Sequence, residues 1–301
     1  MEKRKATCRV ALLSLLAAFF LTALKLSVAL WTHSLALLSD ALHSGLDLLA
    51  SGMTLFAVIS AAKPPDPEHA FGHGKIENIS ALAQTLLLFA TSFWIAQEAL
   101  ERLASPASPA HPSLVAVGIM LISLAIDVNR VRVLKRAAKE HKSQALEADA
   151  LHFSTDLLSS SFVLIGLTLA LAAEALNLRE STKNLVSQAD TVAALAVSLI
   201  IALTGLTLAK KAIGILIDRA EPKLTESIRA SVLQVPGVLA VLSLRARESG
   251  PTHFVDIVIS VLGEHTVEEA HAIADSVERA VCAIIPGADV IVHVEPGKPS
   301  T

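Results

Sequence analysis

Two short segments of this chain repeat each other almost residue for residue, and both contain the pattern H-x-x-x-D. The first segment, DALHSGLDLLAS, covers residues 40–51, and the second, DALHFSTDLLSS, covers residues 149–160. In each one a histidine precedes an aspartate by four positions, so on a helix the two side chains lie on one face, one turn apart. The side chains concerned are His43, Asp47, His152 and Asp156.

Two such faces placed together would offer two imidazole nitrogens and two carboxylates to one ion. Nitrogen and oxygen ligands of this kind form tetrahedral sites for zinc and similar divalent metals. Two aspartate charges would offset the charge of the ion, so the filled site would be close to neutral. A single H-x-x-x-D could equally be a polar patch that pairs across a helix interface. Two copies in register, both inside apolar segments, favour the metal site.

The elements that must position these residues are long enough to cross a membrane. The chain has 301 residues, of which 53% are hydrophobic, and its mean hydropathy is +0.59. A helix crosses the hydrocarbon core of a bilayer with about 20 apolar residues. Six segments qualify, namely residues 8–31, 35–62, 76–103, 112–134, 145–176 and 187–217. We therefore predict an all-α transmembrane domain of six helices over residues 1–217.

Basic residues gather in alternate connections between these segments. They precede the first segment, flank the second connection, cluster over residues 130–142 and follow the sixth segment, whereas the other connections carry few. The positive-inside rule then predicts that both termini lie in the cytoplasm. The net charge of −3 gives no reason to expect nucleic acid as a partner. Cys8 and Cys282 offer no Cys-x-x-Cys motif, so any metal must be held by His, Asp or Glu.

From about residue 218 the composition becomes mixed and no membrane-length apolar run remains. A helix is predicted over residues 223–233, and strands over 238–247 and 253–261 are joined at a Gly-Pro turn. Thr266 and Glu269 form a capping-box pattern that opens another helix, and a last strand covers residues 289–294. The order αββαβ predicts a ferredoxin-like α+β domain over residues 218–301, large enough to fold around its own core.

The connection after the second segment, KPPDPEHAFGHGKIEN, carries a second group of possible ligands. Asp66, His69 and His73 could form a partial metal site, and the alternative is a solvated acidic loop that binds nothing. Asp40 and Asp149 lie one turn before the two intramembrane histidines. They are candidates for fixing the tautomer of an imidazole or for acting as gate residues.

In combination, these features resemble the cation diffusion facilitator family of zinc and related metal exporters. The features are six spans, the paired H-x-x-x-D, the motif F-G-H-G-K-x-E at residues 71–77 and the αββαβ tail. The resemblance implies a transport site at the four intramembrane residues and a second site at the loop residues Asp66, His69 and His73. It further implies that Lys75 and Asp218 form a charge lock at the interface of a homodimer.

The resemblance also implies a metal site between the two cytoplasmic domains of the dimer. His271, His293 and Glu295 stand at matching positions, and Asp256 is a further candidate. Leu242 and Val258 occupy positions where the histidine-rich members carry histidine, which predicts a weaker site or fewer bound ions. The alternative is that His271 is an exposed helix residue and His293 an edge-strand residue.

The implied function is secondary active export of Zn²⁺ in exchange for protons by alternating access, in a multi-pass protein of a bacterial inner membrane. The expected partners are divalent metal ions, protons, membrane lipid and a second copy of the chain, with no organic cofactor. An intramembrane hydrolase is disfavoured, because the protein can fill all four zinc positions and no glutamate base lies beside them. Export of Fe²⁺, Cd²⁺, Co²⁺ or Mn²⁺ and a membrane metal sensor without transport remain alternatives.

Overall fold

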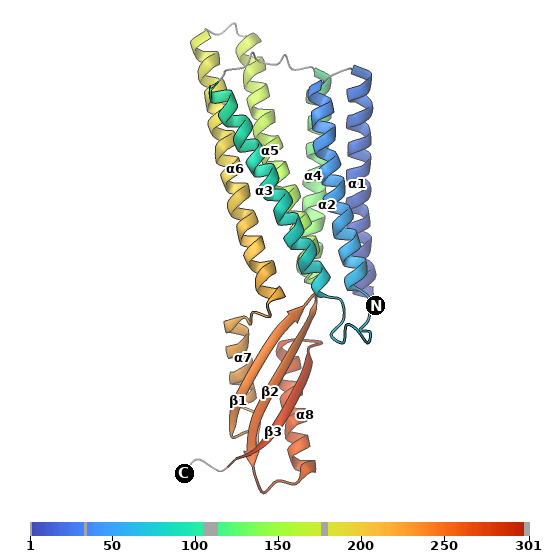
Figure 1. Ribbon diagram of the computed structural model, residues 1–301, viewed down its shortest axis with the longest axis vertical. Helices are drawn as coiled ribbons and strands as arrows, with labels where there is room; N and C mark the ends of the chain where they lie inside the picture. Colours follow the sequence, from blue (N-terminus) through green and yellow to red (C-terminus); the bar gives the residue numbers. More distant parts are fainter. Residues whose placement is uncertain (1, 33–34, 105–113, 176–179, 298–301) are drawn as a thin grey trace. The chain divides into compact units, whose positions relative to one another are not determined.

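The computed structural model describes residues 2–32, 35–104, 114–175 and 180–297, and it follows the predicted order of six long helices and an αββαβ tail (Figure 1). The elements are α1 Glu2–Thr32, α2 Leu35–Ala61, α3 Lys75–Ala104, α4 Leu114–His141, α5 Gln144–Ala175, α6 Glu180–Leu216, α7 Pro222–Val232, β1 Ala240–Ser249, β2 Thr252–Leu262, α8 Val267–Ile284 and β3 Asp289–Gly297.

The chain forms two compact units, and each unit is made of two separate ranges of the sequence. The first unit comprises Met1–Ala62 and Ile76–Ala212, and the second comprises Lys63–Lys75 and Ile213–Thr301. The connection between α2 and α3 therefore groups with the C-terminal residues, although both flanking helices belong to the first unit. The predicted loop site thus shares a unit with the αββαβ tail.

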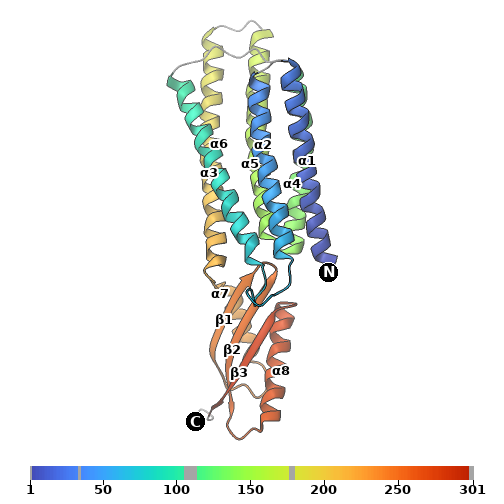
Figure 2. The same ribbon diagram turned by 45° about the vertical axis from the view of Figure 1, so that its right-hand side comes forward.

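In the first unit, helices α1, α2, α4 and α5 form a four-helix bundle. The neighbouring pairs are α1 with α2, α1 with α4, α4 with α5, and α2 with α5. Helices α3 and α6 lie beside this bundle (Figures 1 and 2) and pack against α5 through buried residues that include Leu88, Ala148 and Ile201. Small side chains such as Ala11, Ala57 and Ala145 fill much of the bundle core, which lets the helices approach closely.

The outer surface of the first unit carries many large apolar side chains, including Phe20, Phe56 and Phe93. A surface this apolar is typical of helices that face lipid. By length and composition, α1, α2, α3 and α6 can each cross a membrane. Helix α4 carries Asp127, Arg130 and further charges. That α4 and α5 also cross the membrane, which would give six spans, stays a prediction.

The second unit contains a three-stranded sheet in the order β1-β2-β3, with β1 and β2 antiparallel and β2 and β3 parallel. Helices α7 and α8 cover the sheet through a core that includes Ile228, Val232, Ile257 and Val281. The predicted capping box is present, because Thr266 accepts from the backbone of Glu269 and the Glu269 side chain accepts in return. The predicted αββαβ order is confirmed, and β3 extends beyond its expected end to Gly297.

Candidate metal centre

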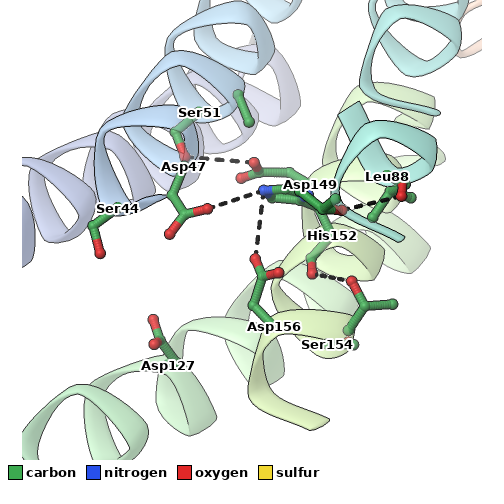
Figure 3. A network of polar contacts seen from close by, with 12 residues as sticks. Ser44, Asp47, Ser51, Leu88, Asp127, Asp149, His152, Ser154 and Asp156 are labelled. Carbon is green, nitrogen blue, oxygen red and sulfur yellow. Dashed lines mark hydrogen bonds and ion pairs between the residues drawn. The ribbon is translucent and has the colours of Figure 1, made fainter. Parts of the chain in front are cut away.

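The two H-x-x-x-D faces meet inside the first unit, where α2 and α5 are neighbours. Ligand atoms of His43, Asp47 and Asp156 all lie within 4.8 Å of one another. The Nε2 atom of His152 lies 3.3 Å from Oδ1 of Asp47 and 3.4 Å from Oδ2 of Asp156 (Figure 3). The structure therefore brings His43, Asp47 and Asp156 together and places His152 against both carboxylates, which offers two nitrogen and two oxygen ligands in one region.

Burial differs among these four side chains. His152 is fully buried against Phe153, whose ring meets the imidazole edge to face at 5.2 Å between centroids. His43, Asp47 and Asp156 are each half-buried. One ligand is thus fixed by packing, and the other three are less completely enclosed. This combination suits an ion that must enter and leave.

Asp149 does not contact His152 in the way expected of a residue that fixes an imidazole tautomer. Its carboxylate accepts hydrogen bonds from Ser14 on α1 at 2.9 Å and from Ser51 on α2 at 3.5 Å. The remaining sequence hypothesis for Asp149, a role in gating, is compatible with these bonds. The side chain of Asp40 lies outside the described part of the structure.

The position of Arg130 differs from the sequence prediction, which placed it with the basic residues of the connection at 130–142. The side chain is buried inside the bundle, with Nε 2.8 Å from the hydroxyl of Ser14. The signal that could have revealed this position is an ionisable residue in an otherwise apolar stretch of helix.

Lys25 and Asp127 are two further ionisable residues that the sequence interpretation missed. The Lys25 ammonium donates to the hydroxyl of Ser44 at 2.9 Å. Asp127 on α4 lies within electrostatic reach of Asp47 and Asp156, and its carboxylate points toward them in Figure 3. Both residues therefore add charge close to the candidate centre, and each is an ionisable residue in a largely apolar stretch of helix.

The loop residues Asp66, His69 and His73 also come together, in the second unit. Their ligand atoms lie within 4.8 Å of one another, and one carboxylate faces both rings, with Oδ1 3.0 Å from Nδ1 of His69 and Oδ2 3.3 Å from Nε2 of His73. Although slight desolvation raises the pKa of Asp66, the hydrogen bonds from His69 and the nearby His73 hold it below its ordinary value. The carboxylate is therefore ready to bind a cation at neutral pH.

The loop that carries this group is fastened to the β1–β2 hairpin of the same unit. Phe71 packs edge to face on Phe254 at 5.2 Å, and the guanidinium of Arg247 lies 4.0 Å from the centroid of the Phe71 ring. Gly74 touches the hairpin turn so closely that an added Cβ would lie 2.8 Å from the backbone nitrogen of Gly250. Only glycine fits this contact without displacing the loop.

The predicted partners Lys75 and Asp218 form an ion pair in the second unit, with 2.8 Å between Nζ and Oδ1. Lys75 also donates to the carbonyl of Leu216, and Arg247 lies 3.6 Å from the second carboxylate oxygen of Asp218. The hydrogen bond from Lys75 is the main cause that holds the pKa of Asp218 below its ordinary value. The place of this pair in a dimer stays a prediction.

The four candidate residues of the tail do not form a cluster within one chain, as far as residues 213–297 are described. Asp256 pairs with Arg245 at 3.3 Å, His271 lies 3.7 Å from Asp275, and His293 lies 3.9 Å from Glu295. The side chains of His271 and His293 are 77% and 67% exposed. A site between two cytoplasmic domains would draw ligands from both copies, so these residues stay candidates.

The architecture and the paired faces agree with the comparison to known families. The family described as the cation efflux transmembrane domain matches residues 11–217, which is more than half of the chain. The chain belongs to the cation efflux family. A second family, described as the cytoplasmic domain of cation efflux proteins, matches residues 220–297. The family consists of transporters, and membership agrees with a membrane protein that is not an enzyme.

Bacterial relatives of this cation efflux protein match over most of both chains. A cation-efflux pump FieF of Yersinia enterocolitica is 32% identical over 272 residues, which cover 88% of this chain and 85% of that protein. The FieF of Cronobacter sakazakii is 30% identical over 292 residues, covering 96% and 92%. Among solved structures, a cadmium form of a MamM CTD variant is 36% identical and covers 25% of this chain and 95% of that chain, with a TM-score of 0.25.

Proposed function

We propose that this protein exports a divalent metal cation, with Zn²⁺ as the preferred ion, in exchange for protons. The observation that carries the proposal is the convergence of two imidazoles and two carboxylates from α2 and α5. Ligands without thiolate suit a site that must release its ion. Cation efflux is also the activity for which these relatives are named.

Proton exchange follows from the chemistry of the ligands. Only the neutral imidazole binds metal, so metal binding displaces protons and metal affinity depends on pH. Because the imidazole pKa is ordinarily about 6.5, a moderate pH difference across a membrane changes the occupancy of such a site. A proton gradient would then drive release of the ion on the acidic side.

Alternating access would arise from rocking of α2 and α5, with their neighbours, around the centre between them. The second unit would support a homodimer, in keeping with the family match of its tail. Metal bound at Asp66, His69 and His73, or between two tails, would favour one arrangement of the pair, and by reciprocity that arrangement would favour metal. The bacterial relatives support an inner-membrane location, and the alternation of basic residues between connections supports both termini in the cytoplasm.

Flux into proteoliposomes tests the proposal. Purified protein is reconstituted, a pH difference is imposed, and zinc movement is followed with an internal indicator. We expect zinc flux that reverses with the gradient and is lost in Asp47→Ala, whereas Glu101→Ala, which removes an exposed carboxylate on α3, transports normally. Zinc binding without flux would instead indicate a sensor, and stronger flux of Fe²⁺, Cd²⁺, Co²⁺ or Mn²⁺ would change the assigned ion.

A further inference from the structure

Four polar side chains from four different helices form a connected cluster next to the metal centre. The cluster consists of Ser14 on α1, Ser51 on α2, Arg130 on α4 and Asp149 on α5, and the exposed fraction of each residue is 5% or less. We call it the Arg130–Asp149 tie. A buried arginine and a buried aspartate in an apolar bundle are costly, which calls for an explanation beyond packing.

Two serine hydroxyls bridge the opposite charges of the tie. Arg130 donates from Nε to Ser14 at 2.8 Å and from a terminal nitrogen to Ser51 at 2.5 Å. Each hydroxyl then donates to one oxygen of Asp149, from Ser14 at 2.9 Å and from Ser51 at 3.5 Å. The guanidinium also stacks on Phe153, 3.4 Å from the ring centroid. All four helices of the bundle are therefore joined through one charge pair.

The tie lies on one side of the metal centre. On α2, Ser51 follows Asp47 by one turn toward the end of the helix at Ala61, and on α5, Asp149 precedes His152 by about one turn toward Gln144. These two helix ends lie at the same end of the bundle (Figure 1). The apolar core continues beyond the tie with Val58, Leu134 and Leu146. The half-buried ligands therefore have no open path toward this end.

We propose that the Arg130–Asp149 tie is the closure between the metal centre and the Ala61 end of the bundle, and that it separates when that end opens. This inference rests on the proposed transport, because only a transporter needs a path that opens and shuts. Bridging hydroxyls can be replaced by water, so a wet path can separate α1 and α2 from α4 and α5 without leaving either charge unsolvated. Apolar side chains would make a firmer permanent contact.

The tie also balances charge beside the centre. Arg130 is balanced by Asp149 through the two hydroxyls and by Asp127, whose carboxylate lies 4.0 Å from the guanidinium. Its charge is therefore compensated before a divalent ion meets Asp47 and Asp156. A closure made from a lone cation would compete with the metal for these carboxylates. The hydroxyl bridge thus keeps a positive side chain close to the centre without placing it in the site.

Thiol labelling from each side of the membrane tests the closure in the full chain. The background is Cys8→Ser with Cys282→Ser, which removes both native thiols, and the reporter is Asp47→Cys at the centre. Arg130→Gln is compared with Arg132→Gln, its matched control on the exposed face of α4. A membrane-impermeant thiosulfonate is applied to inside-out and right-side-out vesicles, and the rate of modification is measured without metal.

We expect Arg130→Gln to speed modification from the side that carries the loop after α2 by about tenfold, the effect of losing one hydrogen bond to a charged group. Arg132→Gln should leave both rates unchanged. Ser51→Ala removes one bridge but keeps both charges, and it should act in the same direction if Arg130→Gln does not fold.

Unchanged rates in both tie variants, or equal increases from both sides, overturn the closure. Because labelling needs neither metal nor flux, that result leaves the transport proposal standing, and absent zinc flux in the unmodified protein overturns transport instead.

Discussion

The Nε2 atom of His152 on α5 lies 3.3 Å from Oδ1 of Asp47 on α2, although 105 positions of the chain separate the two residues. This contact joins the two copies of the repeated motif. It means that each half of the candidate centre is incomplete without the other, because neither helix alone offers more than one imidazole and one carboxylate from its motif.

Loss of one ligand from either helix should therefore abolish transport to a similar degree. We expect Asp47→Ala and His152→Ala each to lower zinc affinity and flux by at least about 100-fold, because even residues that only support ligands cost 10–100-fold. Flux in proteoliposomes and zinc titration of the detergent-solubilised protein measure this. If His152→Ala kept normal flux while Asp47→Ala did not, the centre would not include His152.

Replacing an imidazole by a carboxylate should change which ion is preferred. In His43→Asp the centre would offer one nitrogen and three carboxylates, and oxygen-rich sites suit harder ions such as Mn²⁺ better than imidazole sites do. We expect the ratio of zinc to manganese flux to fall by about tenfold or more. Competition between the two ions in one flux assay measures the ratio, and a constant ratio would show that His43 does not contact the ion.

Gly74→Ala should disturb the loop site without touching a ligand. An added Cβ would collide with the carbonyl of Ser249 and lie 2.8 Å from the nitrogen of Gly250, so the loop must move away from the hairpin. We expect weaker zinc binding at Asp66, His69 and His73, seen as the loss of one class of sites in a binding titration. Gly118→Ala is the control, because nothing lies within 4 Å of its added Cβ.

The ion pair between Lys75 and Asp218 should make stability depend on pH in a defined direction. The pKa of Asp218 is lowered in the folded protein, so the pair contributes fully above the unfolded value of about 3.9 and its contribution is lost as pH falls through the folded value. We expect Asp218→Asn to lower the melting temperature more at pH 7 than at pH 3. An equal difference at both pH values would contradict the contribution of this carboxylate.

The sequence was sufficient to predict which side chains of the repeated motif meet between α2 and α5. Two H-x-x-x-D patterns in apolar helices place His43, Asp47, His152 and Asp156 on two faces, and a shared ion requires these faces to meet. Local signals also predicted the tail well, because the capping box at Thr266 and the alternation of the strands depend on neighbouring residues alone.

The sequence could not predict the Arg130–Asp149 tie, because its partners come from four helices. Which side chains meet across a bundle depends on how each helix is rotated about its axis, and an apolar span with small residues permits several rotations. Arg130 therefore looked like one more basic residue near a membrane surface. The position of Gly74 against the β1–β2 hairpin was hidden for a similar reason, since the contact is between backbones and leaves no pattern in side-chain type.

The loop group of Asp66, His69 and His73 supplies three ligand atoms and no more from its own cluster. A tetrahedral ion held there would keep its fourth position for a water molecule. An ion with a coordinated water exchanges ligands readily, so occupancy would rise and fall with the amount of free metal around the protein. The occupancy of such a site would follow the concentration of free metal. The transport rate would then rise when metal is in excess and fall when it is scarce.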